Sequence, residues 1–570
     1  MHSSTSLTTG RTCDKCQAAF TIYPDEEEFL RKMIFTFGAT KIHPPLPVYC
    51  PDCRLKIRTC HRNEWHFYRR TATLTGKEMI SIYDEEPLWG SKDAVYTHDE
   101  WNDDRRDFIE HGRPYDFSQP FFPQFAALHK AVPRLGSMLM GNENCDYTAG
   151  TGYCKDCYLI NSSEYCERCY YGKLFQSSRD SVDCSYLYGS ELCYECLSVF
   201  KSYGLDFVAF SQNCRDCSFS WNLSGCSNCC LCSNLRQKQY HFLNEPLSKE
   251  EYERRIAEFR GLATAMEAMR KRWMQLFAKM IHRSANIVSS EHCTGDFIEN
   301  SKDCIDCYDM NESQDCRNVI VGVQVKDCYD CSNMYIKPEL CYDTLGTLEV
   351  YRCAYCLFVF HCRDLLYCEY CYFCKDCFGC VGLKRKQYCI FNKQYTKEEY
   401  EALVPRIVEH MKGTGEWGLY FPPSLSPFGY NESLAHEYLP LTKEGAQVQG
   451  FYWRDIEEKK LTVSKTISTD TLPDRIEDVH DDVVDWAILC ERTGRPFRLL
   501  KQELDFYRRK KLPLPHLHPD VRYDRRLALR NPRRLWSRNC MKCQKEMQTT
   551  YAPERPEIVY CENCYLKEVY

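Results

Sequence analysis

The chain has 570 residues, which is long enough for about three to five domains. It contains 40 cysteines, 40 tyrosines and 29 phenylalanines, and this aromatic content argues against a disordered chain. The mean hydropathy is −0.53 and no apolar run approaches about 18 residues, so we expect no membrane span and no membrane partner. The net charge of −6 argues against a protein that coats nucleic acid over its whole surface, but it leaves room for local basic sites.

The many cysteines indicate either a disulfide framework or metal binding. Disulfide-rich proteins are usually small and secreted, whereas this chain is large and Met1 to Gln17 contain no apolar secretory segment. We therefore expect a reducing cytoplasm, where cysteines at short spacing more often bind metal.

Two pairs of CxxC motifs lie near the ends of the chain. The members of each pair are joined by a connector, of 33 residues in the first pair and 17 in the second. Two such turns bring four thiolates to one ion at about 2.3 Å and leave no open coordination position. We expect a structural zinc ion in each zinc ribbon, at least two per chain, held by Cys13, Cys16, Cys50 and Cys53 and by Cys540, Cys543, Cys561 and Cys564.

A third ribbon lacking ligands precedes the last one. Residues 13–20 match 490–497 with Thr493 in place of the second cysteine, and residues 50–54 match 518–522 with His518 and Val521 in place of cysteines. One cysteine and one histidine do not hold structural zinc, so we expect 486–538 to be metal-free.

Basic residues cluster beside the ribbons. Residues 54–70 hold six basic residues and one acid, 501–540 hold twelve and four, and 71–117 hold five basic residues and twelve acids. Such clusters with aromatics can bind phosphates and stack bases, dock on an acidic protein face including this protein's own, or remain a solvated face. The nucleic-acid interpretation assigns contacts to Arg54, Arg58, Arg62, Trp65, Tyr68, Arg69, Arg70, Arg526, Arg530, Arg533, Arg534 and Arg538.

The centre of the chain is duplicated with an offset of 148 residues. Residues 235–240 recur as 383–388, residues 248–253 recur as 396–401, and Cys193 matches Cys341. Ser248 with Glu251, and Thr396 with Glu399, have capping-box spacing, so a helix closes each copy. We expect the first helix to run to about His282 and the second to end near Pro405.

Within each copy the cysteines repeat every 12 residues. In the first copy most cysteines occupy two of the twelve phases, and steps of 12 recur in the second copy, including Cys316 to Cys328. A short fixed period of this kind is typical of a stacked β-solenoid. Twelve residues are either a whole narrow coil or half of a wider one, and the many aromatics favour the wider coil.

The role of the repeated thiols stays open between three alternatives. They can pack as small apolar residues, form disulfides between neighbouring strands, or share additional zinc ions. The best candidates for additional zinc are Cys154, Cys157, Cys166 and Cys169, followed by Cys214, Cys217, Cys226 and Cys229. The run Cys368, Cys371, Cys374, Cys377, Cys380 is similar to a ferredoxin spacing but lacks its last interval and proline, so an iron–sulfur or thiol redox protein is a further alternative.

Three segments resemble a large uncharacterised bacterial family that is rich in cysteine. They are residues 379–400, Cys50 to Arg54 with Arg62 to Glu64, and the tail from Asn531 to Tyr570. Residues 13–60 also resemble the probable zinc-ribbon domain of many small bacterial proteins. The resemblance implies the ribbon architecture and zinc, and it implies no activity.

Together these patterns predict a mainly β protein with capping helices, in which zinc ribbons flank two tandem cysteine-rich β-solenoid-like modules. No catalytic signature is present, such as a phosphate-binding Gly loop, HExxH or GxSxG, and no small-molecule substrate is indicated. We expect a non-enzymatic zinc protein that binds or scaffolds a protein partner or nucleic acid, with an RNA- or DNA-binding protein as an alternative. The expected units are 1–70 (zinc ribbon with basic extension), 71–143 (acidic α+β region), 144–284 and 285–412 (repeat modules with closing helices), 413–485 (connector, partly flexible), 486–538 (metal-free ribbon) and 539–570 (zinc ribbon).

Overall fold

The computed structural model describes residues 9–86, 94–323, 332–335, 342, 344–455 and 463–569. Cys328 and Cys341, which the predicted spacings include, lie outside these ranges. The described chain contains more strand than helix. Within the same ranges, none of the helices combines the length and the apolarity needed to cross a lipid bilayer.

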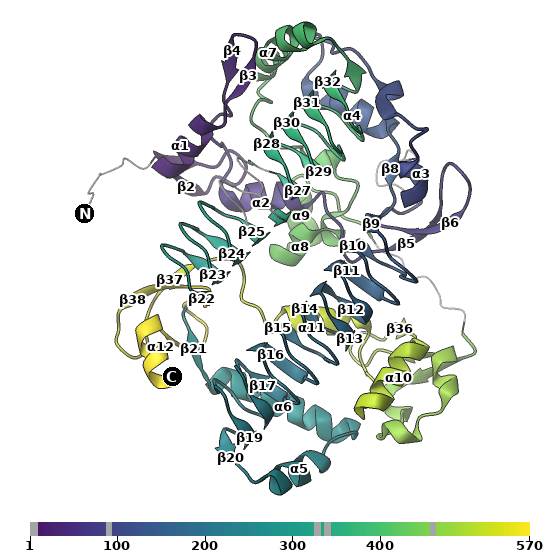
Figure 1. Ribbon diagram of the computed structural model, residues 1–570, viewed down its shortest axis with the longest axis vertical. Helices are drawn as coiled ribbons and strands as arrows, with labels where there is room; N and C mark the ends of the chain where they lie inside the picture. The colour runs from purple at the N-terminus through teal and green to yellow at the C-terminus, as the bar shows by residue number, and fades with distance from the viewer. Residues whose placement is uncertain are drawn as a thin grey trace.

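Two stacks of short parallel strands form the centre of the molecule (Figure 1). The N-terminal stack contains β9 (Leu139–Met140), β10 (Ala149–Gly152), β11 (Tyr158–Glu164), β12 (Glu167–Gln176), β13 (Arg179–Val182), β14 (Ser185–Tyr188), β15 (Leu197–Phe200), β16 (Asp206–Gln212), β17 (Ser218–Trp221), β18 (Ser227–Cys230) and β19 (Gln239–Phe242). The C-terminal stack contains β22 (Ile287–Val288), β23 (Gly295–Glu299), β24 (Cys307–Asn311), β25 (Ile320–Val323), β26 (Ser332–Tyr335), β27 (Leu345–Leu348), β28 (Tyr351–Ala354), β29 (Leu357–Phe360), β30 (Arg363–Leu366), β31 (Lys375–Phe378) and β32 (Gln387–Ile390).

Neighbouring strands of a stack are 12 residues apart, and we call each 12-residue step a rung. Tyr158 pairs with Tyr170, and Lys375 pairs with Gln387. The offset is 11 between β22 and β23, where Ile287 pairs with Ile298, and 13 between β26 and β27, where Ser332 pairs with Leu345. A wider 24-residue coil would place residues 24 apart in register, so the expectation of the wider coil is wrong.

Every third residue of a stack has a left-handed backbone conformation. The series is unbroken from Asn144 to Leu243 and from Glu349 to Phe391, glycines included. This conformation costs roughly 1–2 kcal/mol for a residue other than glycine. Hydrogen bonds to the adjacent rungs offset the cost, because the Asp156 amide donates to Glu143 O at 3.0 Å and the Lys155 amide donates to Cys166 O at 2.8 Å.

The side chain that follows each left-handed residue points into the stack. One rung places Cys157, Ile160, Ser163 and Cys166 inside, all exposed by 2% or less. Most aromatic rings lie instead on the outside, where Trp221 stacks on Trp273 at 4.5 Å between ring centroids. Phe175 is an exception, and its ring lies in the interior beside the small Gly172. The prediction of the wider coil failed because most of the rings do not need room in the interior.

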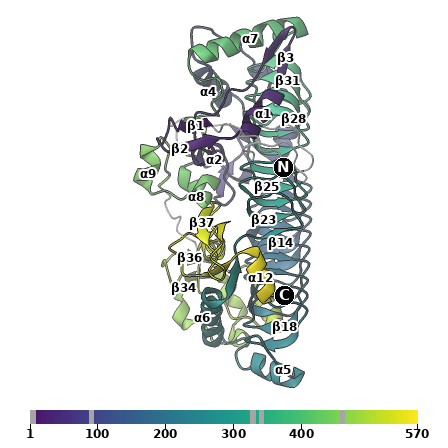
Figure 2. The same cartoon turned by 90° about the vertical axis from the view of Figure 1, so that its left-hand side faces the viewer.

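Helices cover one side of both stacks and close their ends (Figure 2). The N-terminal stack ends in the antiparallel pair β19–β20 (Glu245–Pro246), then α5 (Lys249–Ala257) and α6 (Ala263–Lys279). The C-terminal stack ends in β32–β33 (Lys393–Gln394), then α7 (Lys397–Gly413). The first expected helix is therefore divided at Gly261, which has a φ of 82°.

Pro405 does not end the second helix, which corrects our expectation. Helix α7 continues to Gly413 with Pro405 inside it. Val404, Ile407 and Val408 on both sides of the proline are fully buried, so packing holds the helix together despite the lost backbone hydrogen bond.

The ribbons and connecting segments lie along the helix-covered side. The N-terminal part contains β1 (Thr9–Thr12), β2 (Ala19–Ile22), α1 (Pro24–Lys32), β3 (Phe35–Phe37), β4 (Thr40–Ile42), α2 (Pro51–Thr59), β5 (Tyr68–Thr71), β6 (Glu78–Ser81), β7 (Val95–Tyr96), α3 (His98–Asn102), α4 (Phe121–Ala131) and β8 (Arg134–Leu135). The C-terminal part contains α8 (Leu434–Tyr438), α9 (Lys443–Val448), β34 (Lys465–Ser468), β35 (Trp486–Leu489), β36 (Pro496–Phe497), α10 (Lys501–Lys510), α11 (Pro519–Leu527), β37 (Trp536–Asn539), β38 (Glu546–Thr549), β39 (Ile558–Tyr560) and α12 (Glu562–Val569). Strand β21 (Ile281–Arg283) pairs with β39 and so joins the last ribbon to the linker between the stacks.

Much of the expected connector is ordered. Strand β34 pairs in parallel with β35, and Ile476, Val479 and Val483 are buried. The stretch 456–462 of that connector lies outside the described residues.

Candidate metal centres

The N-terminal ribbon brings its four predicted ligands together. The ligand atoms of Cys13, Cys16, Cys50 and Cys53 all lie within 4.8 Å of one another. Cys13 and Cys16 lie in the turn between β1 and β2, whereas Cys50 and Cys53 lie at the start of α2. The Cys50 amide donates to the Cys13 sulfur at 3.2 Å.

The C-terminal ribbon repeats this arrangement. Cys540, Cys543, Cys561 and Cys564 form a second group within the same 4.8 Å limit. The Cys561 amide donates to the Cys540 sulfur at 3.2 Å, as Cys50 does to Cys13. Both groups therefore have a geometry suited to one metal ion.

The sulfur separations fit a tetrahedral ion. Cys16 Sγ and Cys50 Sγ lie 3.6 Å apart, and Cys543 Sγ and Cys561 Sγ lie 3.7 Å apart. A tetrahedron with metal–sulfur bonds of about 2.3 Å has edges of about 3.8 Å. Four thiols in this arrangement fill the coordination sphere, which is typical of structural rather than catalytic sites.

One thiol in each group has a lowered pKa and therefore ionises more readily than a free cysteine. A hydrogen bond from the Cys53 side chain lowers the pKa of Cys50 to about 5. Desolvation opposes ionisation of Cys540, but the backbone amides of Cys543 and Cys561 lower its pKa to about 6. Thiolates are the metal-binding form of cysteine, so both groups favour uptake of a cation near neutral pH.

The third ribbon does not gather ligands. Cys490 and His518 occupy two positions, Thr493 and Val521 occupy the others, and in the described ranges these residues form no group of three or more ligand atoms within 4.8 Å. The Cys490 amide donates to Arg495 O and the Gly494 amide to Cys490 O, as in a complete knuckle.

The thiols inside the stacks do not form groups like the terminal ones. Within the described part of the chain, neither Cys154, Cys157, Cys166 and Cys169 nor Cys214, Cys217, Cys226 and Cys229 bring three ligand atoms within 4.8 Å. Their sulfurs instead lie beside carbonyl oxygens: Cys154 Sγ is 3.4 Å from Gly152 O and 3.6 Å from Ser163 O. The additional zinc sites proposed from the sequence are therefore not supported.

Serine replaces cysteine at equivalent positions, which explains the choice of side chain. Ser178 Oγ lies 2.9 Å from Gln176 O and 3.2 Å from Leu187 O, the same two carbonyl positions relative to the side chain. A small side chain with one weak donor thus satisfies the backbone and fills a narrow interior.

The cysteine run from Cys368 to Cys380 has the same environment. Cys371 Sγ lies 3.5 Å from Glu369 O, and Cys377 Sγ lies 3.3 Å from Lys375 O. Burial raises the pKa of both thiols well above the usual value, so they stay protonated. Hydrogen bonds with neighbouring thiols lower the pKa of Cys374 and, against desolvation, that of Cys380. In the described residues, however, no three thiols of this run lie within 4.8 Å of one another, so the geometry does not support a cluster.

Four of the ten arginines assigned to nucleic acid are buried, which does not fit that assignment for them. Arg54, Arg58, Arg70 and Arg526 are exposed by 9% or less. Arg526 pairs with Asp183 of the N-terminal stack at 3.0 Å. A buried guanidinium cannot reach a phosphate without leaving the protein core.

The remaining members of that set also have partners within the chain. Arg62 pairs with Glu64 at 2.6 Å, Arg533 pairs with Asp309 at 2.9 Å, and Arg530 pairs with the same Asp309. Trp65 stacks on Tyr523 at 3.9 Å, and the Tyr68 hydroxyl bonds to Glu432. Arg69 bonds to Tyr147, and Arg538 donates to Ala552 O at 3.3 Å. Arg534 is exposed and lies over the Trp536 ring. The basic islands thus serve mainly to dock the ribbons on the stacks.

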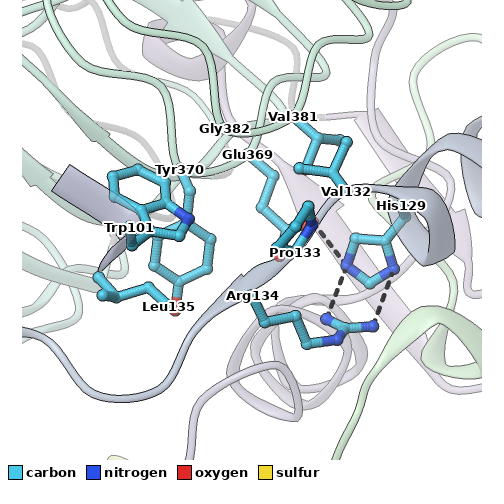
Figure 3. A pocket seen from close by; sticks show the side chains of 10 residues that line it. All are labelled: Trp101, His129, Val132, Pro133, Arg134, Leu135, Glu369, Tyr370, Val381 and Gly382. Atoms are coloured by element: carbon cyan, nitrogen blue, oxygen red, sulfur yellow. Dashed lines mark hydrogen bonds and ion pairs between the residues drawn. The ribbon is translucent and has the colours of Figure 1, made fainter. Parts of the chain in front are cut away.

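A small polar cavity lies where α4 meets the C-terminal stack (Figure 3). His129 Nε2 is 2.8 Å from Glu369, Arg134 donates to the His129 ring at 3.1 Å, and Trp101 and Tyr370 complete the lining. Its volume of about 10 Å³ accommodates about one water molecule. This cluster therefore positions α4 rather than binding a substrate.

The spacing of one inward side chain in every three residues was not predicted from the sequence. The runs Cys154 to Cys157 and Cys368 to Cys380 follow it, but serine, leucine, valine and threonine fill most other inward positions and conceal it.

Comparisons with protein-family models and with curated protein sequences return no match for the chain.

Proposed function

We propose that the protein is a non-enzymatic scaffold whose two terminal ribbons each hold one structural zinc ion. The observation that carries this proposal is the pair of closed four-thiol groups, with sulfur separations of 3.6 and 3.7 Å. Zinc favours this ligand set and geometry, and a structural zinc contributes about 10–16 kcal/mol to folding. The many reduced thiols are compatible with a cytoplasmic location.

We also propose that each stack is a narrow β-solenoid and that the two arose by duplication. The 12-residue register and the left-handed residue at every third position support the solenoid. Both stacks end in an antiparallel pair followed by a helix that starts after a capping hydroxyl, Ser248 in one and Thr396 in the other, which supports the duplication.

A protein partner on the outer face of the stacks is the favoured binding role. Figure 2 shows that helices and ribbons cover one side of the stacks and leave the opposite side open. The N-terminal stack carries a ladder of alternating charges, Glu143, Lys155, Glu167, Arg179 and Glu191, and the exposed stacked rings of Tyr153 and Tyr165. Extended repeat surfaces commonly bind protein partners.

Elemental analysis and a binding assay together test the proposal. Purified protein should contain two zinc ions per chain, and fewer than two would remove the terminal sites. RNA and DNA binding measured between about 50 and 200 mM salt tests the nucleic-acid alternative, because each phosphate contact releases a counterion. Salt-dependent binding that is lost in Arg534→Ala would favour nucleic acid over a protein partner.

A further inference from the structure

The first knuckle of each terminal ribbon has the same set of three backbone hydrogen bonds. In the N-terminal ribbon the Cys13 amide donates to Ala18 O at 2.9 Å and the Gln17 amide donates to Cys13 O at 2.9 Å. The Asp14 amide donates to Val48 O at 3.1 Å, which ties the first knuckle to the second. The C-terminal ribbon repeats all three bonds, from Cys540 to Lys545, from Gln544 to Cys540 and from Met541 to Val559.

Residues 72–77 reproduce this signature without a cysteine. The Ala72 amide donates to Lys77 O at 2.8 Å, and the Gly76 amide donates to Ala72 O at 2.9 Å. The Thr73 amide donates to Val95 O at 2.9 Å, which is the counterpart of the tie from Asp14 to Val48. Gly76 has a φ of 70°, and the equivalent Gln17 has a φ of 61°. A common β-hairpin would not supply the distant third bond.

The strands and the helix around this turn match as well. Thr71 pairs with Glu78 in β5 and β6, as Thr12 pairs with Ala19 in β1 and β2. Helix α3 begins directly after Thr97, as α2 begins directly after Cys50. Val95-Tyr96-Thr97 aligns with Val48-Tyr49-Cys50 and with Val559-Tyr560-Cys561.

We infer that residues 68–86 and 94–102 form a fourth ribbon, in which Ala72, Thr75, Thr97 and Glu100 occupy the four zinc-ligand positions and a Thr–Glu capping box replaces the ion. Thr97 Oγ1 accepts from the Glu100 amide at 3.2 Å, and Glu100 Oε2 accepts from the Thr97 amide at 2.8 Å. Each side chain therefore bonds to the backbone amide of the other residue, at the position where two thiolates would bind a metal.

The bond from Thr73 to Val95 ties the two knuckles together, and the Glu100 carboxylate closes the second knuckle without a cation. Desolvation opposes ionisation of Glu100, but the neighbouring Thr75 and Thr97 lower its pKa, so the group is charged at neutral pH. A carboxylate accepts hydrogen bonds from the amides that would otherwise surround thiolates. The N-terminal and C-terminal parts of the chain therefore each contain one complete ribbon and one metal-free ribbon.

The metal-free ribbon keeps the docking function of the others. Trp101 stands four residues after the third ligand position, as do Arg522 and Tyr565. Trp101 packs on Tyr372 of the C-terminal stack with ring centroids 5.2 Å apart. Arg522 pairs with Asp183, and the Tyr565 hydroxyl accepts from Asn222 at 2.5 Å, both in the N-terminal stack. The metal-free ribbons therefore keep a contact with a stack although they lack the zinc ligands.

Restoring four thiols tests the assignment of ligand positions. The variant A72C/T75C/T97C/E100C should raise the zinc content from two to three ions per chain, and cobalt should give a third set of tetrahedral thiolate absorption bands. The control T73C/L74C/H98C/D99C adds the same number of thiols one residue away and should stay at two ions. A folded restored variant with two ions would overturn the inference.

Hydrogen exchange on the unaltered protein tests the same inference without any substitution. On chelation of zinc, the amides of Asp14 and Met541 should lose protection, because their knuckles depend on the ion. The amides of Ala72, Thr73 and Gly76 should remain protected. Loss of protection at these three together with the terminal knuckles, or exposure of the three before chelation, would contradict a metal-free ribbon.

Discussion

Arg526 and Asp183 lie 3.0 Å apart in a fully buried ion pair, although 343 residues separate them in the chain. Arg522 of the same helix α11 bonds to the same carboxylate. Asp183 thus fastens the third ribbon to the N-terminal stack, and the two arginines act inside the protein rather than on its surface.

Replacing Arg526 by alanine should destabilise the fold strongly. Removing one partner of a buried pair costs about 3–5 kcal/mol, and because Asp183 keeps Arg522 as a partner we expect a loss toward the lower end of this range. Urea unfolding of Arg526→Ala measures the loss, and the exposed Arg534→Ala serves as control with a change within about 0.5 kcal/mol. Equal stability of the two variants would show that the pair does not anchor the ribbon.

Loss of the C-terminal zinc should loosen more than its own ribbon. In Cys540→Ser we expect one zinc ion per chain instead of two, together with faster amide exchange at Ile281–Arg283, because β21 pairs with β39 of that ribbon. Cys184→Ser, a change inside the N-terminal stack, should keep both ions. An unchanged zinc content in Cys540→Ser would remove Cys540 from the ligand set.

Serine should substitute for a stack cysteine at small cost. Cys196 Sγ lies 3.4 Å from Tyr194 O and 3.6 Å from Leu205 O, positions that serine hydroxyls occupy elsewhere in the stack. We expect Cys196→Ser to lose less than about 1.5 kcal/mol and Cys196→Phe to lose about 1–3 kcal/mol or more by overpacking. A drop in zinc content in the serine variant would instead identify Cys196 as a ligand.

Buried stack thiols with a raised pKa, such as Cys230 and Cys353, should be unreactive in the folded protein. Burial raises the pKa of Cys230 and of Cys353 to about 12, and reaction with iodoacetamide requires the thiolate. Chelation should expose the terminal ligands to labelling, beginning with the exposed Cys16 and Cys543, while Cys230 and Cys353 react only after denaturation. Peptide mapping of the labelled sites distinguishes these groups, and early labelling of Cys230 or Cys353 would argue for an open stack.

Acid should destabilise the protein through two buried histidines. Burial lowers the pKa of His61 and of His282 to about 4, below the value of 6.5 expected in the unfolded chain. The unfolded state therefore binds more protons between pH 6.5 and 4, so stability is complete above pH 6.5 and falls as the pH approaches 4. The loss is roughly 3 kcal/mol for each histidine.

The pH dependence of unfolding checks this assignment. His282 accepts from the Tyr551 hydroxyl and donates to Phe277 O, at 2.9 and 2.8 Å, as a neutral imidazole does. His282→Gln should flatten the dependence between pH 6.5 and 4, whereas the exposed His292→Gln should leave it unchanged. If the His282 variant keeps the full pH dependence of its unfolding free energy, that dependence arises from other groups.

The metal groups were predictable because each CxxC motif fixes its own local turn. The 12-residue period also appeared in the sequence, since Cys154 and Cys166 mark it directly. The interior was harder to predict, because Ser178 and Leu187 occupy the same kind of position as a cysteine and no single residue type marks it. Burial of Arg526 could not be read from the sequence at all, since its partner Asp183 is distant in the chain and resembles any turn aspartate.

The spacing of one inward side chain per three residues limits how the length of this protein can change during evolution. A deletion or insertion of 12 residues removes or adds one rung and leaves all four interior columns in register. A change of three residues keeps the inward residues inside but shifts the rest of the stack by a quarter of a rung. Different residues would then face α6, α10 and α11. A change of one residue breaks the three-residue series and needs a local irregularity to absorb it, as between β22 and β23, where the offset is 11 and Gly295 has a φ of 132°. Variation in stack height among descendants of this sequence should therefore occur in multiples of twelve residues.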